Sequence, residues 1–388
     1  MVVSNETPVR VRLNDRQRLD WLQLLRSENV GPAIFRDLLN YFGSAGAALE
    51  ALPDLARRGG SKKRIRIAPL EAVEREMHAL EQLGARLVAP GEEGYPSLLQ
   101  HIHAPPPLLA IRGSLTIAAQ PALAIVGGRN SSLAGRKLAG EIATDLGNAG
   151  YSIVSGLARG IDAAAHHAAL KTGTIAVLAG GPDIIYPPEH DTLARDILDQ
   201  GGAIISEMPL SWQPRARDFP RRNRLISGTG LATILVEAAA RSGSLHTAKF
   251  ALEQGRDVLA IPGSPKDPRA SGCNSLIRQG ATLVTSAHDI LEAVRAQNGL
   301  FETSPPLSTP YPVDRIQATN EATTQSAPAA NTDDHRQAIL GALGSTPQEV
   351  DELSRFLQID IREINLILLE LEIAGKLERH AGHKVSLV

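Results

Sequence analysis

The sequence contains little cysteine, no large excess of either charge and no long apolar run. A single cysteine, Cys273, among 388 residues excludes an intrachain disulfide and any metal site built from several cysteines. The net charge of −2 excludes a uniformly cationic nucleic-acid coat, so a polyanion site has to come from local clusters. No stretch approaches the roughly 20 apolar residues of a transmembrane helix, and residues 1–13 lack an apolar signal core. We therefore expect a cytoplasmic protein that does not enter a membrane.

Motifs of several enzyme classes are absent as well. The first glycine-rich loop has Gly127 and Gly128 but no third glycine at the G-x-G-x-x-G spacing, and a Ser-Gly pair at 155–156 stands where a dinucleotide-binding enzyme has an acidic residue. No G-x-x-x-x-G-K-[ST] motif for phosphoryl transfer occurs. The neighbours His166 and His167 point in different directions on an expected helix, so they form no i, i+4 metal pair. We expect no cofactor and no metal ion.

The middle of the chain alternates apolar runs with amphipathic segments of helical length. Such alternation is typical of a parallel sheet covered by helices on both faces, which predicts a Rossmann-like α/β core. The expected strands are residues 123–127, 151–155, 174–179, 203–207, 231–236, 257–261 and 281–285. The proline-rich segment 95–113 precedes them and is expected to pack on an edge of the sheet, because proline cannot donate to a sheet ladder.

Smaller domains are expected on both sides of this core. Residues 1–80 resemble a helix-hairpin-helix or SAM-like helical module, with a turn at Asn29-Val30-Gly31-Pro32 and a basic run at 57–66 that either binds nucleic acid or is solvated surface. The extended Rossmann-like domain covers 81–298. Residues 299–334 are rich in Ser, Thr, Pro, Ala and Asn and are predicted to form a flexible linker.

Residues 335–388 have the pattern of three helices and a β-hairpin, which resembles a winged helix. Its third helix carries Glu363, Glu370 and Glu372 against Arg362 alone, a charge balance poorly suited to the major groove. We therefore expect a protein-docking or dimer-supporting module. The alternative is a winged helix that contacts duplex DNA through its basic wing.

Unusual residues stand at the expected carboxyl ends of the strands, where ligands bind in open α/β sheets. Three loops, 127–132, 155–160 and 237–244, combine glycines with hydroxyl, amide or arginine side chains. Five arginines against one acid, Asp218, occupy residues 208–230, and arginine favours planar, bidentate phosphate contacts. These arginines are Arg215, Arg217, Arg221, Arg222 and Arg224. The arrangement predicts a site for a long anion.

At these residues the chain is similar to the DprA/Smf family of DNA-processing proteins of natural transformation. The matching elements, within residues 95–293, are Ile125-Val126-Gly127-Gly128-Arg129, Ser155-Gly156-Leu157-Ala158-Arg159-Gly160-Ile161-Asp162 with His166, Tyr186-Pro187, Ser206-Glu207, Phe219-Pro220-Arg221-Arg222-Asn223-Arg224-Leu225-Ile226, Glu237 with Ser242-Gly243-Ser244-Leu245 and Thr247-Ala248, Pro262-Gly263, and Asn274 with Leu276-Ile277. The chain departs from the family pattern at Gly128, Pro182 and Cys273. The resemblance implies single-stranded DNA binding, loading of a RecA-type recombinase, and a non-catalytic protein that forms a homodimer.

The resemblance also implies which residues bind DNA. Arg129 and Arg159 should reach phosphates from adjacent loops, and Phe219 should either stack on a base or act as a hydrophobic staple before its helix. The full predicted set is Gly127, Gly128, Arg129, Ser131, Gly156, Arg159, Phe219, Arg221, Arg222, Asn223, Arg224, Ser242, Gly243 and Ser244. Glu237 is expected to orient an arginine or the Ser242-Gly243-Ser244 turn.

Two other functions remain open. A nucleotide or phosphoribosyl hydrolase is one, because Glu237 followed by Ser242-Gly243-Ser244 and Thr247 resembles the nucleotide loop of lysine-decarboxylase-like Rossmann families. A sensor of small nucleotides is the other. The missing acid–base and metal machinery favours binding over catalysis, and the arginine row favours a long anion over a mononucleotide.

Overall fold

The computed structural model describes residues 12–301, 332–380 and 382–388 and divides the chain into two compact units. The core unit comprises Met1–Arg12 and Arg75–Pro310, and the terminal unit comprises Leu13–Glu74 and Tyr311–Val388. The chain passes from the terminal to the core unit within helix α4 (Leu70–Gln82). Most of the expected linker lies outside the described residues, and the predicted domain boundaries remain predictions.

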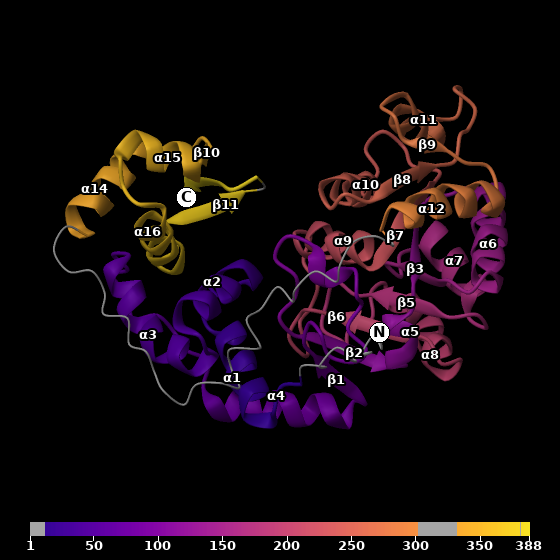
Figure 1. Cartoon of the computed structure of the whole chain (residues 1–388). Helices are drawn as coiled ribbons and strands as arrows, with labels where there is room; N and C mark the ends of the chain where they lie inside the picture. The colour runs from indigo at the N-terminus through magenta and orange to yellow at the C-terminus, as the bar shows by residue number, and fades with distance from the viewer. Residues whose placement is uncertain (1–11, 302–331, 381) are drawn as a thin grey trace, which may run out of the picture. The chain divides into compact units, whose positions relative to one another are not determined.

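The core unit is built on a nine-stranded sheet in the order β1-β2-β6-β5-β4-β3-β7-β8-β9 (Figure 1). Its strands are β1 (Ala85–Val88), β2 (Leu109–Gly113), β3 (Ala122–Gly127), β4 (Ser152–Ser155), β5 (Thr174–Val177), β6 (Ala203–Ser206), β7 (Gly230–Val236), β8 (Asp257–Ala260) and β9 (Thr282–Leu283). Strands β3 to β9 pair in parallel and confirm the seven predicted strands. The antiparallel strands β1 and β2 extend one edge, as the proline-rich segment predicted.

Strand β3 is the point where the chain reverses its direction across the sheet. The strands that follow it in sequence, β4 to β6, lie on one side of β3, and β7 to β9 lie on the other. At such a switch point the loops after neighbouring strands diverge and leave a crevice at the carboxyl ends. The predicted site loops follow β3, β4 and β7, so the fold places them at this crevice.

Helices cover both faces of the sheet because alternate residues of each strand point to opposite sides. Leu123 and Ile125 of β3 pack against α6, α7 and α12, whereas Ala124 and Val126 pack against the face of α9, α10 and α11 (Figure 1). The helices of this unit are α5 (Leu115–Ala119), α6 (Leu133–Asn148), α7 (Ile161–Ala169), α8 (Asp191–Asp199), α9 (Asp218–Thr229), α10 (Ser244–Glu253), α11 (Ser271–Arg278) and α12 (Ala287–Phe301), with short 3₁₀ turns at Leu99–His101 (η1), Pro188–His190 (η2) and Pro268–Ala270 (η3).

The terminal unit combines the N-terminal helices with the winged helix. Its first part is α1 (Asp15–Arg26), α2 (Pro32–Phe42) and α3 (Ala45–Arg58); its second is α14 (Thr332–Ala342), β10 (Gln348–Glu349), α15 (Val350–Leu357), α16 (Ile361–Ile373), β11 (Leu377–His380) and β12 (Lys384–Leu387). Asn14 and Gln17 form a capping box at the start of α1, and Pro32 starts α2 at its first position. The predicted three helices and hairpin are confirmed.

Helix α16, the third helix of the winged helix, packs on two partners at once. Ile364, Ile367 and Leu371 belong to the core of the winged helix, while Leu366 and Leu369 are buried on another side of the helix. Helices α2 and α3 contact this helix in the terminal unit. A helix with apolar side chains on two sides packs against two partners and does not present both of these sides to solvent. The winged helix therefore shares its central helix with the N-terminal domain.

The contact between the two domains is closely fitted. The side-chain amide of Asn29 donates to the carbonyl of Ile373 at 2.9 Å. A Cβ atom on Gly59 would lie 2.0 Å from the carbonyl oxygen of Glu370, so only glycine allows α3 to approach this closely. The turn between α1 and α2 thus serves, at Asn29, to satisfy the last carbonyl of another helix.

The glutamates of α16 are engaged inside the terminal unit. Glu370 is fully buried; its carboxylate lies 2.6 Å from Arg336 and 3.9 Å from Arg58. Burial raises the pKa of this carboxyl group, and the two arginines lower it by a smaller amount. Glu372 pairs with Arg379, which also reaches Asp37 at 3.1 Å. These carboxylates lie at the domain contact, where their charge is compensated by arginines. The charge balance of α16 in sequence is therefore no guide to the charge of its surface.

Candidate nucleic-acid interface

The first site loop leaves β3 in close contact with β7. A Cβ atom on Gly127 would lie 2.0 Å from the carbonyl oxygen of Val236, and one on Gly128 would lie 2.6 Å from that of Glu237. Both glycines are therefore required by packing. They bring the loop to a point where Arg129 is exposed, with its guanidinium carbon 5.5 Å from the ring centroid of Phe219. A cation and an aromatic face meet there at a favourable distance.

The second site loop, after β4, is held from below by two buried charged residues. Asp162, at the start of α7, accepts hydrogen bonds from the backbone N–H groups of Gly156 at 3.1 Å and Ala158 at 3.3 Å. Arg222 donates to the carbonyl of Gly156 at 2.8 Å and to that of Val177. Arg159 projects from the same loop into solvent, and its Nη2 donates to Glu189 at 2.6 Å.

Arg222 is a buried arginine beneath the site rather than a residue of an open rim. It is 6% exposed, although it lines the cavity with part of its side chain. Burial lowers the pKa of Arg222 to about 10, while the charge of Asp162 opposes this and that of Arg129 adds to it. Arg222 therefore keeps its charge at neutral pH. Its hydrogen bonds connect the carboxyl ends of β4 and β5, and its charge makes the cavity more positive.

The two other predicted arginines of α9 share one carboxylate. Arg221 Nε lies 3.0 Å from Glu207, and Arg224 pairs with the second oxygen of the same carboxylate and donates to Ala104 O at 2.9 Å. Arg224 is thus committed to holding α9 against the loop around Ala104, whereas Arg221 is exposed. Neither arginine lines the cavity described below.

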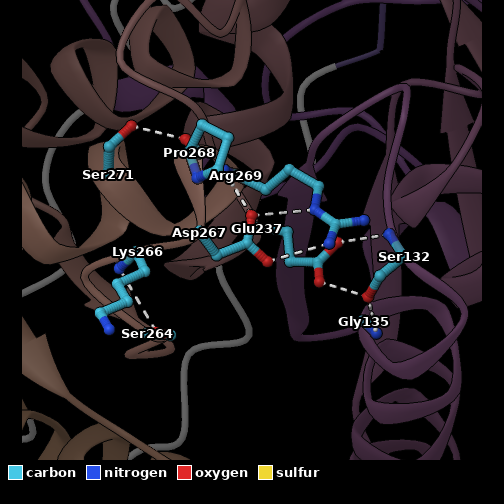
Figure 2. Close-up of polar contacts among 9 residues, drawn as sticks. All are labelled: Ser132, Gly135, Glu237, Ser264, Lys266, Asp267, Pro268, Arg269 and Ser271. Atoms are coloured by element: carbon cyan, nitrogen blue, oxygen red, sulfur yellow. Dashed lines mark hydrogen bonds and ion pairs between the residues drawn. The ribbon is translucent and has the colours of Figure 1, made fainter.

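Glu237 closes the third loop in a way the sequence did not predict. Its carboxylate accepts hydrogen bonds from the backbone N–H and the hydroxyl of Ser132, the N-cap residue of α6 (Figure 2). A Cβ atom on Gly135 would lie 2.4 Å from this carboxylate, so the first turn of α6 leaves room for it. The hydrogen bonds of Glu237 go to Ser132 and not to the Ser242-Gly243-Ser244 turn, while its charge acts on Arg269, so the expectation that it orients an arginine stays a prediction.

The serine turn of the third loop is organised on its own. Ser242 and Ser244 are linked by a hydrogen bond of 2.8 Å between their hydroxyl groups. Asn223 donates to the carbonyl of Gly243 at 3.3 Å and accepts from Arg222 Nε at 3.3 Å, which joins α9 to this turn. Nearby, Asp267 holds the guanidinium of Arg269 from within one short turn (Figure 2).

These loops enclose a cavity of about 560 Å³. Nine predicted residues line it: Gly127, Gly128, Arg129, Phe219, Arg222, Asn223, Ser242, Gly243 and Ser244. A smaller cavity of about 60 Å³ adjoins it, with Gly156, Arg159, Phe219 and Arg222 among its lining residues. Ser131 faces neither cavity; it is buried, and its hydroxyl has no partner within the part of the chain that the structure describes. Eleven of the fourteen predicted residues thus meet at two adjoining cavities.

Several lining residues were missed by the reasoning from sequence. Arg241, His246 and Arg269 line the larger cavity, and Tyr186 lines the smaller one. Arg241 directly precedes the serine turn and could have been included on position alone. Arg269 follows the expected strand 257–261 by eight residues, and its place along this segment could not be predicted from sequence. Across the described ranges, no cluster of three potential metal ligands and no helix able to cross a membrane is found.

Three family models match the chain in order. Residues 86–295 match the model for DNA recombination-mediator protein A, residues 15–79 that of the DprA-like N-terminal HHH domain, and residues 323–383 that of the DprA winged helix domain. The Smf protein of Escherichia coli is 38% identical over 322 residues, which is 82% of each chain. The DNA processing protein DprA of Streptococcus pneumoniae is 44% identical over 202 residues, which cover 52% of this chain and 71% of that protein.

Solved structures agree with the match in sequence. The X-ray structure of DprA from Streptococcus pneumoniae superposes with a TM-score of 0.59 at 34% identity and covers 72% of this chain and 98% of its own. DprA from Helicobacter pylori, a protein studied for its single-stranded DNA binding mode, gives a TM-score of 0.50 at 25% identity and covers 55% of this chain and 96% of its own. With these matches over its core and both terminal domains, the chain belongs to the DprA/Smf family of DNA-processing proteins.

Proposed function

We propose that this protein binds single-stranded DNA at the crevice beyond β3, β4 and β7 and performs no chemistry on it. The observation that carries the proposal is the pair formed by Arg129 and Phe219 at the wall of a cavity of about 560 Å³. Proteins that bind single strands combine a positive groove for the phosphates with aromatic faces for the bases. Arg129 is exposed and makes no ion pair with another described residue, so its charge is available to a phosphate.

The other charges around the crevice support a polyanion. Arg241 and Arg269 line the same cavity as Arg129, and Arg159 stands at the adjoining one. Cations spaced along one crevice fit successive phosphates of a strand better than the single phosphate of a mononucleotide. Lys249 and Glu253, by contrast, pair with each other on the exposed side of α10 and do not belong to this row.

The position of Glu237 disfavours the hydrolase alternative. A general base needs a carboxylate oxygen that can reach the proton it removes. Both oxygens of Glu237 accept hydrogen bonds from Ser132, which fixes the carboxylate at the N-terminus of α6. Glu237 lines the cavity, but its carboxylate supports the first loop through Ser132 and already accepts a hydrogen bond on each oxygen, which makes it poorly suited to the role of general base.

We infer the partners from what membership of the family suggests. Its core domain is that of a recombination mediator, and we infer that the bound strand is passed to a RecA-type recombinase and that a homodimer does this, in the context of natural transformation. A direct check is the nucleation time of a recombinase on single strands with and without this protein. The Arg129→Ala variant should lose any shortening of that time, because it can no longer hold the strand.

The central test is an affinity measurement with labelled single strands, matched duplexes and nucleotides. We expect tighter binding to single strands than to duplex, and a log–log salt slope of roughly −0.7 for each phosphate neutralised. Arg129→Ala should weaken binding and reduce the magnitude of the salt slope by roughly 0.7, the contribution of one phosphate. Its thermal stability should change little. Arg195→Ala is the matched control, because Arg195 is an exposed arginine on α8 that pairs with Asp191 and lines neither cavity. Equal affinity in all three proteins would reject the proposal.

A further inference from the structure

An exposed tyrosine lies beside the predicted DNA-binding residues. Tyr186 is 48% exposed, and its ring centroid lies 5.2 Å from that of Phe219 with 58° between the ring planes. It reaches this position from the loop between β5 and η2, which is separate from the three glycine-rich site loops. Of the large apolar side chains exposed on the described part of the core unit, Leu133, Leu252 and Leu283 are aliphatic and Tyr186 is aromatic.

Positive charge stands on both sides of this pair of rings. The guanidinium of Arg129 lies over Phe219, and Arg159 is close enough to Tyr186 for the two side chains to influence each other electrostatically. All four side chains line the smaller cavity, together with Pro187. A nucleotide presents a phosphate and a flat base at opposite ends, so a ring pair flanked by two arginines fits its two kinds of surface.

We propose that Tyr186 and Phe219 form a stacking platform for one unpaired base of the bound strand, an inference that rests on the proposed function. The cavity between the rings is only about 60 Å³, so the base lies against the open ring of Tyr186 and is not enclosed. Apart from the arginines, which we assign to phosphates, the described residues that line the smaller cavity have few polar atoms that could bind the edge of a base. The platform therefore accepts any base, and purines more strongly because they stack better.

The platform also favours single strands. A base within a duplex is already stacked between its neighbours, and it has to be unstacked before its face can meet Tyr186. Single strands offer such faces at little cost. Selection against duplex DNA is thus achieved by aromatic contact, in addition to any effect of charge.

The experiment combines protein variants with oligonucleotides that lack one base. Tyr186→Leu removes the ring and keeps an apolar side chain, and Tyr186→Phe keeps the ring and removes the hydroxyl. Oligonucleotides with one abasic position, moved along the strand, report where a base matters. We expect Tyr186→Leu to weaken binding about 5- to 150-fold, the range for loss of one stacked base, and Tyr186→Phe to bind like the parent. For the parent protein one abasic position should weaken binding, and for Tyr186→Leu the same position should have no effect.

Two outcomes would overturn the platform. One is Tyr186→Leu binding within twofold of the parent; the other is an equal abasic penalty in parent and Tyr186→Leu. Arg129→Ala separates this failure from that of the proposed function. If Arg129→Ala loses affinity and Tyr186→Leu does not, the platform is wrong and DNA binding at the crevice stands. If neither variant loses affinity, the site itself is wrong and the platform falls with it.

Discussion

The guanidinium of Arg222 donates to the carbonyl of Gly156, 66 positions earlier in the chain, from a buried position. A Cβ atom on Gly156 would lie 2.6 Å from Nη2 of this arginine, so the loop and the guanidinium fit closely together. The same side chain also donates to Val177. Arg222 therefore fixes the loop that carries Arg159, and this role does not depend on contact with a ligand.

Replacing Arg222 with methionine should destabilise the core unit strongly. The carbonyls of Gly156 and Val177 would lose their donor, and the buried carboxylate of Asp162 would lose its compensating charge. We expect the free energy of unfolding to fall by about 3–5 kcal/mol, the cost of breaking a buried charge interaction from one side. Urea unfolding measures this loss. Arg221→Met is the control, because Arg221 is exposed and its loss leaves Glu207 paired with Arg224. If Arg221→Met lost as much stability as Arg222→Met, the structural role given to Arg222 would be contradicted.

Removing the carboxylate of Glu189 should increase affinity for single-stranded DNA. In the free protein the carboxylate of Glu189 forms an ion pair with the guanidinium of Arg159, and this contact lowers the pKa of Glu189. A phosphate has to displace it before it can bind Arg159. Because exposed ion pairs are weak, we expect Glu189→Gln to bind about two- to fivefold more tightly.

The matched control for this variant is Asp191→Asn, which frees Arg195 on the neighbouring helix in the same way. It should leave affinity unchanged, because Arg195 lies outside both cavities. Fluorescence anisotropy at low salt gives both values. Weaker binding by Glu189→Gln would show that the carboxylate positions Arg159 for the strand and does not compete with it.

The stability of the core unit should fall below neutral pH because of His166. Burial, and then the charges of His167, His190 and Arg222, lower the pKa of His166 to about 3. The unfolded chain takes up a proton near pH 6.5 and the folded chain does not, so this contribution to stability is complete above pH 6.5 and is lost as the pH falls toward 3. The loss is about 1.4 kcal/mol per pH unit within that window.

Urea unfolding at pH 7.5, 6.5 and 5.5 measures this dependence. His166→Asn should flatten it, because asparagine can keep the contact that the ring nitrogen Nδ1 makes with Thr174 and does not titrate. The slope is the readout, so a lower overall stability of the variant does not obscure it. An identical slope in parent and variant would assign the acid sensitivity to another group.

A methyl group at Gly59 should separate α3 from α16. Its backbone has φ of −65°, which alanine adopts freely, so the effect comes only from the clash with Glu370. Overpacking of this kind costs about 1–3 kcal/mol. Hydrogen exchange of residues 366–373 should become faster in Gly59→Ala. Gly341→Ala, in α14 with no atom within 4 Å of the added carbon, should leave exchange unchanged or slow it; the reverse order of the two variants would contradict the contact.

The sequence predicts the sheet and its site loops well because local signals specify them. Apolar runs such as 123–127 and 174–179 are strands on composition, and the carboxyl ends of parallel strands meet at one rim whatever the exact packing. Arg129 could be placed at that rim from its position after the first strand, whereas Phe219, in the first turn of α9, was placed there by the resemblance to the family. Their distance from each other could not be predicted, because it depends on how α9 lies across β3.

Predictions that depended on side-chain partners were less successful. Arg222 and Arg224 look alike in the run Arg221-Arg222-Asn223-Arg224, yet one is buried under Gly156 and the other is bound to Glu207. Spacing on a helix shows which side a residue faces, but it does not show which distant carbonyl or carboxylate lies there. The hydrogen bonds between Glu237 and Ser132 were not predicted for the same reason, since Ser132 is 105 positions away.

The docking of the winged helix had a sequence signal that charge obscured. Leu366, Leu369 and Ile373 are apolar at positions of α16 that the core of the winged helix does not use. A second apolar side on a helix indicates a second partner. Three glutamates drew attention to the surface of α16, although the structure binds Glu370 and Glu372 to arginines at the domain contact.

The contact of α16 with α2 and α3 also has a consequence for folding during translation. Gly59 is synthesised long before Glu370, and at 5–20 residues per second the ribosome takes roughly 15–60 s to cover the distance between them. During this interval the side of α2 and α3 that will receive α16 has no partner from its own chain. The contact of α2 and α3 with α16 can form only after α16 has been synthesised, so this side of the N-terminal helices is open to other chains during translation.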